Sequence, residues 1–222
     1  MTHPITAPAE TTTPPGTLWS RMKADPQYAP EHMALEAVRR LGPEAGRWAG
    51  RMRAERPELS PDELAVLAVK HFTTLARVSG AVSGAAGLPG AVLDVGVLAW
   101  TQARMVLHVA AVYGADPTAP ERATDLLVLQ RVHRIAETAR TALAVAAGRE
   151  RASRLFTGAT GRPLTRVLMT MGVRLAQMAG VRAARRVFAK MIPGAGMILG
   201  TWVNSAATRD LARRAAIHYR NG

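Results

Sequence analysis

Two long apolar stretches, each interrupted by a Pro-Gly pair, constrain the fold of this chain more than any other feature. Residues 78–103 contain one ionisable side chain, Asp94, and residues 191–208 contain none. An unbroken apolar helix of about 20 residues could cross a bilayer. The first stretch contains Leu-Pro-Gly-Ala at 88–91 and the second contains Ile-Pro-Gly-Ala at 192–195. Since proline and glycine both disfavour a helix interior, we expect each stretch to be interrupted there.

For the first stretch we expect a glycine-rich turn near residues 87–90, followed by a helix from about Val92 to Tyr113 that Gly114 closes. Both stretches carry a polar side chain, Asp94 in the first and Asn204 in the second. Such side chains are costly in hydrocarbon. We therefore expect the two stretches to form a buried core and not to insert into lipid as hairpins.

The periodicity of the whole chain predicts an all-α fold. Apolar residues recur at intervals of three and four, and no segment alternates with a period of two, which is the pattern of helices. We expect a single multi-helix bundle with the two glycine- and proline-punctuated helices at its centre. Two short helices, Glu31–Leu41 and Pro43–Glu55, are predicted on either side of Gly42.

Two capping-box patterns predict helix starts. Ser-Pro-Asp-Glu at 60–63 places a serine three residues before a glutamate, with proline at the first helical position, and predicts a helix to about Val78. Thr-Ala-Pro-Glu at 118–121 repeats the pattern. It predicts a long helix over residues 120–147, which Gly148 ends.

The N-terminal residues are expected to be disordered, unlike the rest of the chain. Residues 1–17 include a Thr/Pro tract at 11–15 and lack a basic segment followed by an apolar one, which excludes the signal-peptide pattern. We expect residues 1–28 to be a disordered leader and residues 29–222 to be the helical domain. The expected location is cytoplasmic, with peripheral attachment at the inner face of the cell membrane.

Positive charge is concentrated in the middle of the chain. The formal net charge is +13, from 29 basic and 16 acidic residues, and residues 149–190 hold ten basic residues against Glu150 alone. Such a charge attracts nucleic acid, anionic lipid or an acidic partner. Apolar residues at three/four spacing predict an amphipathic basic helix from about Leu164, with a kink at Gly180. The candidate contacts for an anionic surface are Arg166, Arg174, Arg182, Arg185, Arg186 and Lys190.

No motif in the sequence indicates catalysis, a cofactor or a metal. The chain has no cysteine, which excludes disulfides and thiolate metal sites. Its six histidines do not form a His-Glu-x-x-His pattern, and the glycine run at 80–87 lacks a P-loop lysine. We therefore expect no enzymatic activity, no metal and no cofactor. Asp94 is the most unusual residue, because a carboxylate in an apolar stretch must be paired, protonated or solvated at the surface.

Three groups of residues resemble, in order and spacing, a known bacterial family. They are Leu-Pro-Gly at 88–90 followed by Asp94, the segment 107–114 followed by Ala-Asp-Pro, and Ile-Pro-Gly-Ala-Gly at 192–196 followed by Ala-Ile-His-Tyr at 216–219. Over residues 61–219 the chain resembles the EcsC family. The resemblance implies a helical protein, linked in some members to an ABC-transporter operon and secretion, without established catalytic residues. The positions that carry the resemblance or have a structural role are Pro89, Gly90, Asp94, Tyr113, Gly114, Pro193, Gly194, Gly196, Gly200, Asn204 and Thr208.

The leading hypothesis is a non-catalytic helical module that acts at an anionic membrane surface through its basic segment. The alternative is an accessory or regulatory interaction subunit of an ABC transporter or secretion system. Nucleic-acid binding is less favoured, because no helix-turn-helix or basic patch interleaved with aromatic residues accompanies the charge. The expected partner is therefore an anionic membrane surface or a membrane protein. No feature of the sequence indicates an oligomeric state.

Overall fold

The computed structural model describes residues 13–78, 87–155, 163–180 and 198–222. These residues form helices and connecting turns, with no strand among them, which confirms the predicted all-α class. The elements in chain order are α1 (Gly16–Ala24), the 3-10 turn η2 (Pro26–Tyr28), α2 (Ala29–Glu55), α3 (Pro61–Val78), α4 (Gly87–Val112), α5 (Glu121–Leu129), α6 (Ala136–Leu155), α7 (Leu164–Ala179) and α9 (Ile198–Arg220).

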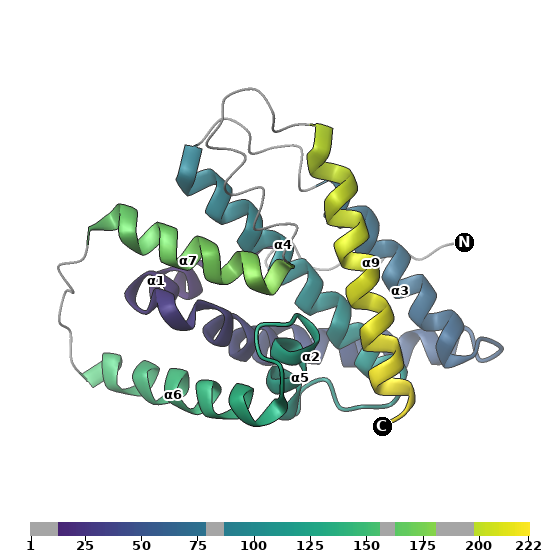
Figure 1. Cartoon of the computed structure of the whole chain (residues 1–222). Coiled ribbons are helices and arrows are strands. Elements are labelled where there is room, and N and C mark those ends of the chain that lie inside the picture. The colour runs from purple at the N-terminus through teal and green to yellow at the C-terminus, as the bar shows by residue number, and fades with distance from the viewer. Residues whose placement is uncertain (1–12, 79–86, 156–162, 181–197) are drawn as a thin grey trace.

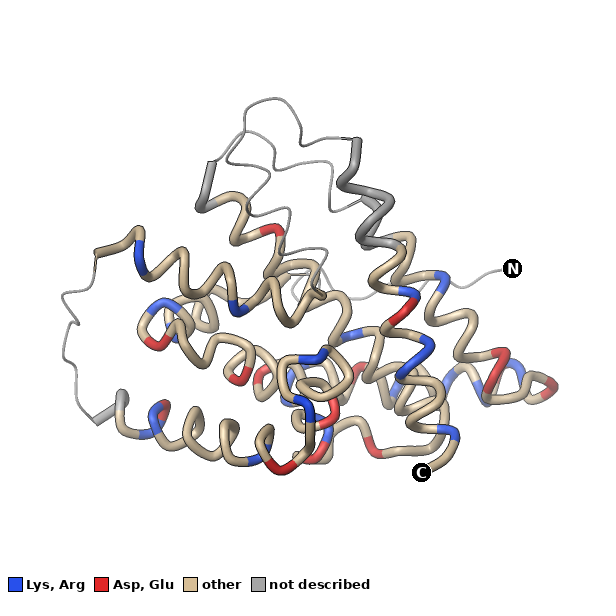
Figure 2. The backbone as a smooth tube through the Cα atoms, in the orientation of Figure 1, with Lys and Arg blue, Asp and Glu red and all other residues tan. Residues whose placement is uncertain are grey.

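Helix α4 forms the centre of the bundle, with α2, α3, α7 and α9 packed around it (Figure 1). Between Gly90 and Val112 it is long and apolar enough to cross a membrane, yet 94% of its most apolar window is buried inside the fold. Trp100 and Met105 on this helix are completely buried. Figure 2 shows that charged residues are sparse along α4. Residues 90–103 of the first apolar stretch are therefore core, as expected. Residues 79–86 of that stretch and residues 191–197 of the second stretch lie outside the described residues.

The start of α4 differs from the sequence prediction, whereas its end agrees. Residues 87–90 form the first turn of the helix and not a turn before it, so the predicted start at Val92 is wrong. Proline is tolerated in the first helical turn because its missing amide has no helical partner there. At the other end, Gly114 has φ +91° and the Ala115 amide donates to the Ala110 carbonyl at 3.0 Å. This is the hydrogen bond of a glycine-terminated helix, as the sequence predicts.

The predicted capping box at the start of α3 is confirmed. The Ser60 amide donates to the Glu63 carboxylate at 2.8 Å, and the Glu63 amide donates to the Ser60 hydroxyl at 3.3 Å. These reciprocal bonds satisfy two amides that the first helical turn leaves without a partner.

The second capping box is wrong, and the helix expected after it begins at the predicted place but is shorter than predicted. Thr118 does not cap a helix; its amide and hydroxyl both donate to Asp116 Oδ1, at 2.8 and 2.7 Å. The helix that follows, α5, ends at Leu129, and a turn separates it from α6. Arg131 adopts φ +60° in that turn. Helix α6 then continues past Gly148 to Leu155.

Helix α2 is continuous, so the two short helices predicted on either side of Gly42 are wrong. Pro43 is exposed, and the helical carbonyl that loses its donor therefore lies on the solvent side. Gly42 has a different role, because a Cβ atom there would lie 2.5 Å from the Pro117 carbonyl oxygen. The glycine lets the loop before α5 approach the helix backbone.

The predicted leader boundary at residue 28 is also wrong. Residues 16–28 form α1 and η2, and Leu18 and Met22 on α1 are completely buried. The Trp19 ring lies so close to Gly96 on α4 that a Cβ atom at position 96 would lie 2.2 Å from it. Helix α1 is therefore part of the packed domain, and residues 1–12 lie outside the described residues.

Candidate functional site

The residues singled out from the sequence occupy several separate places in the fold. Asp94 lies on α4, is partly exposed and is not without a partner. Gly200 and Asn204 lie on α9, and the Asn204 side chain is outside the described part. The remaining Pro-Gly residues of the second stretch, 193–196, are outside it as well. No site can be assembled around the Pro-Gly stretches from the described residues.

Thr208 belongs to a polar contact inside the core. The Gln102 amide group on α4 donates to Thr208 Oγ1 at 3.3 Å and to the Ala179 carbonyl at 3.4 Å. Gln102 is 1% exposed and Thr208 is completely buried. A buried polar group must be hydrogen-bonded to avoid a desolvation penalty, so this contact fixes α4, α7 and α9 to each other.

Tyr113 joins the ends of three helices. Its hydroxyl donates to Asp62 Oδ1 at 2.6 Å, and Arg220 Nη2 donates to the same oxygen at 2.7 Å. The hydrogen bond from Tyr113 and the contact with Arg220 both lower the pKa of the Asp62 carboxyl. Burial, together with the neighbouring Asp62, raises the pKa of Tyr113. The start of α3 and the ends of α4 and α9 therefore meet at one charge-assisted cluster.

The predicted basic helix exists as α7. Its apolar side is buried, including Val167, Met171 and Leu175, which confirms the predicted amphipathic pattern. Gly180, with φ +102°, ends this helix and does not kink it.

The candidate contacts for an anionic surface are described only in part. Arg166 is exposed and Arg174 is partly exposed, so both side chains reach solvent. The other four, Arg182, Arg185, Arg186 and Lys190, lie outside the described residues.

A basic groove between α3 and α9 is the candidate functional site. The two helices lie side by side (Figure 1), and the cavity between them has a volume of about 570 Å³. Figure 2 shows basic positions along α9 toward the C-terminus. Four basic residues and one acid line the groove together with apolar and hydroxyl side chains: Asp62, Ala65, Val66, Val69, Lys70, Thr73, Thr74, Tyr113, Arg209, Ala212, Arg213, Ala216 and Arg220.

The charges in the groove are unbalanced. Lys70 and Arg209 are exposed, and neither contacts a carboxylate among the described residues. Arg213 is 3.7 Å from Asp210 and its side chain is 77% exposed. The one acid that lines the groove, Asp62, already accepts hydrogen bonds from Tyr113 and Arg220. The groove therefore offers uncompensated positive charge to a ligand.

The remaining walls are apolar or carry hydroxyl groups. Val66 is 64% exposed and lies beside Val69, with Ala212 and Ala216 on the facing helix. Thr73 is 6% exposed, and its hydroxyl has no hydrogen-bond partner in the described structure. An orphaned buried hydroxyl costs free energy unless something satisfies it.

The sequence does not predict this groove, although the residue spacing on each of its two helices is visible in the sequence. Arg209, Arg213 and Arg220 follow the three/four spacing that places side chains on one helix face. The spacing of Val66 and Lys70 puts them on one face of α3 in the same way. What the sequence lacks is any local indication that these two faces meet, because the helices are separated by more than a hundred residues.

A second polar cluster is enclosed in the core. Arg104, 3% exposed, donates from Nε to Glu44 Oε1 at 3.0 Å and lies over the Phe72 ring at 5.5 Å. The His108 ring is within hydrogen-bonding distance of the Arg104 carbonyl, 2.8 Å from Nδ1. Burial lowers the pKa of His108 to about 3, so its ring is neutral near pH 7. With all four side chains enclosed, we assign this cluster to core structure.

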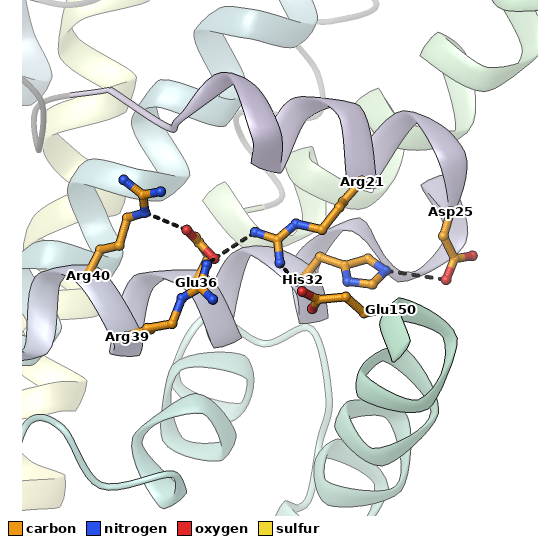
Figure 3. Close-up of polar contacts among 7 residues, drawn as sticks. All are labelled: Arg21, Asp25, His32, Glu36, Arg39, Arg40 and Glu150. Atoms are coloured by element: carbon orange, nitrogen blue, oxygen red, sulfur yellow. Dashed lines mark hydrogen bonds and ion pairs between the residues drawn. The ribbon is translucent and has the colours of Figure 1, made fainter. Parts of the chain in front are cut away.

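An ionic network ties α1 to the rest of the fold (Figure 3). Glu36 on α2 is 1% exposed and accepts hydrogen bonds from Arg21, Arg39 and Arg40, while Arg21 also donates to Glu150 on α6 at 2.6 Å. Burial alone would raise the pKa of Glu36, but the three arginines outweigh it and lower this pKa to about 2. The network lies away from the groove and acts as a connection between α1, α2 and α6.

Comparison with known proteins identifies a family. Residues 60–221 match the model of the EcsC protein family. This region covers most of the chain and includes both helices that line the groove. No curated protein and no solved structure matches the chain.

Proposed function

The chain belongs to the EcsC protein family, and we propose that it is a non-catalytic helical module that acts at an anionic membrane surface. The observation that carries this proposal is the basic groove between α3 and α9. Lys70 and Arg209 present charge there that no carboxylate in the described structure neutralises, beside the exposed side chain of Val66. Cationic side chains beside an apolar one suit the boundary between headgroups and acyl chains.

The arginines of α7 supply a second group of contacts in this proposal. Arg166 and Arg174 reach solvent, and each basic residue near an anionic membrane contributes about 1 kcal/mol of binding free energy. Four residues, two from the groove and two from α7, would give about 4 kcal/mol, which is enough for reversible attachment. Attraction of this origin weakens as salt screens it.

Co-sedimentation of the full chain with vesicles tests the proposal. Vesicles of phosphatidylcholine alone should leave the protein in the supernatant, whereas vesicles that also contain phosphatidylglycerol should sediment it at low salt. The double variant K70Q/R209Q should bind about 30-fold more weakly, because two contacts of about 1 kcal/mol each are lost. The control is R140Q, which removes an exposed arginine on α6, a helix that does not line the groove.

Two results would contradict the proposal. Equal recovery in the supernatant with and without phosphatidylglycerol would exclude a membrane-surface role. Equal losses for K70Q/R209Q and a double variant on α6 would show that total charge, and not the groove, governs binding. Sedimentation with lipid alone also separates this function from the alternative, a transporter or secretion subunit, which would need a protein partner.

A further inference from the structure

The side chains that line the groove between α3 and α9 differ from one end of it to the other. The two helices run antiparallel, since Asp62 at the start of α3 contacts Arg220 at the end of α9. Lys70 and Thr74 on α3 therefore lie toward the end of the groove to which Arg209 contributes. With a rise of about 1.5 Å per residue, the distance from the level of Asp62 to that of Thr74 is about 18 Å along the helix. The groove is thus long enough for more than a small inorganic ion.

The end that contains Lys70 and Arg209 suits a phosphate group. Two cations without carboxylate partners in the described structure lie there, and Thr73 and Thr74 line the same part. The Thr74 hydroxyl already donates to the Lys70 carbonyl at 3.0 Å. Thr73 is 6% exposed, and its hydroxyl has no hydrogen-bond partner among the described residues. Phosphate oxygens accept charge-assisted hydrogen bonds from lysine and arginine, and an acceptor placed next to Thr73 would also satisfy its hydroxyl.

The rest of the groove suits a hydrocarbon chain. Val66, Val69, Ala212 and Ala216 line it, and Val66 is 64% exposed. At the far end Asp62 is already occupied by Tyr113 and Arg220, so no free carboxylate favours a cationic ligand. A volume of about 570 Å³ lies within the range of small-molecule pockets.

We propose that this groove binds one molecule of an anionic glycerophospholipid, with its phosphate between Lys70 and Arg209 and an acyl chain along Val66 and Ala216. The inference rests on the proposed function in that a membrane supplies the ligand. It goes beyond general attraction to a charged surface, because a site for one lipid molecule must also bind that molecule in water, where no surface exists.

Calorimetric titration of the full chain with short-chain lipids below their micelle concentration tests the site. Dihexanoyl phosphatidylglycerol should bind saturably with a stoichiometry of one, and dihexanoyl phosphatidylcholine, which has no net charge, should bind at least 10-fold more weakly. Inorganic phosphate should also bind at least 10-fold more weakly, because it lacks the hydrocarbon chain.

Three variants localise the binding. R209Q should weaken phosphatidylglycerol binding at least 10-fold, while the control R140Q leaves it unchanged. Val66→Asn should weaken phosphatidylglycerol binding but leave phosphate binding unchanged, which separates the two halves of the site. Arg209, Arg140 and Val66 are all exposed, so these changes should leave the thermal unfolding midpoint unaltered.

The outcomes separate this inference from the proposed function. Binding to anionic vesicles without binding to the short-chain lipid would overturn the single-lipid site and leave the surface role intact. Binding of the short-chain lipid without binding to vesicles would overturn the surface role and leave the single-lipid site intact. Equal affinity for phosphate and lipid would show a free-phosphate site and overturn the lipid assignment, as would an unchanged affinity in R209Q.

Discussion

Replacing Glu36 with glutamine should reduce the free energy of unfolding by about 2–3 kcal/mol at neutral pH, with a loss that disappears as the pH falls. The hydrogen bonds from Arg21, Arg39 and Arg40 lower the pKa of Glu36 from 4.5 to about 2 against the opposing effect of burial. A shift of about 2.5 pKa units corresponds to about 3.4 kcal/mol. Since Arg39 and Arg40 are 59% and 44% exposed, solvent screening reduces this figure to the range given.

The sign of the pH dependence follows from the direction of the shift. The pKa of Glu36 is lower in the folded state than in the unfolded state, so its contribution is complete above about pH 4.5 and is lost as the pH falls toward about 2. Glutamine resembles the protonated carboxyl group, so E36Q lacks the stabilisation by the ionised carboxylate at every pH, whereas the wild type loses it only on acidification. The difference between wild type and E36Q should therefore shrink as the solution is acidified, with more than half of it gone by about pH 3.

Urea unfolding followed by circular dichroism at pH 7, 5, 4 and 3 measures this difference directly. The control is E55Q, a change of the same chemistry at an exposed residue at the end of the same helix, which should stay within about 0.5 kcal/mol of wild type. A gap between wild type and E36Q that stays constant from pH 7 to pH 3 would refute the reasoning. So would the absence of any gap at pH 7.

Three further changes test the packing by the same unfolding measurement. E44Q should cost about 3–5 kcal/mol because it leaves Arg104 buried without its carboxylate, whereas the apolar pair E44L/R104M should lie closer to wild type; a pair as damaging as the sum of its single changes would contradict this. G96A should cost about 1–3 kcal/mol because the new methyl group overlaps an α1 indole ring, whereas G50A, which meets nothing within 4 Å, should stabilise by about 0.5–1 kcal/mol. L18A should cost about 2–5 kcal/mol, and no loss would mean that α1 does not pack in solution.

Features with a local cause were predictable from the sequence. The capping box needs only Ser60 and Glu63, three residues apart, and the end of α4 needs only a glycine that accepts positive φ at Gly114. The apolar side of α7 follows from its spacing alone. In each case the residues that determine the structure are within one or two helical turns of each other.

Features with a distant cause were not predictable. The break between α5 and α6 contains no glycine or proline in residues 130–135. Contacts from far along the chain accompany it: the His133 ring lies 2.8 Å from Glu31 Oε1, and Arg214 donates to the Leu129 carbonyl at 3.0 Å. Gly42, inside the continuous helix α2, likewise lies against Pro117 from farther along the chain. Tertiary contacts override local preference at these places.

The same distinction applies to the candidate site. The basic face of α9 is visible in the spacing of Arg209, Arg213 and Arg220, but the groove exists only because α3 packs against it. The anionic-surface contacts are predicted in the basic segment at 149–190 because its charge is dense along the chain. Charge density along the chain does not reveal a groove of this kind, because helix packing combines faces that are distant in sequence.

The buried ion pair between Arg104 and Glu44 has a consequence for the newly made chain. A nascent helix as apolar as Gly90–Val112 is a potential substrate for the membrane-insertion machinery as well as for folding. Arg104 lies near the middle of this segment, where an arginine adds about 2.5–3.5 kcal/mol to the cost of insertion. Folding provides that arginine with a carboxylate, and lipid does not. One side chain thus favours folding into the bundle over insertion into the membrane.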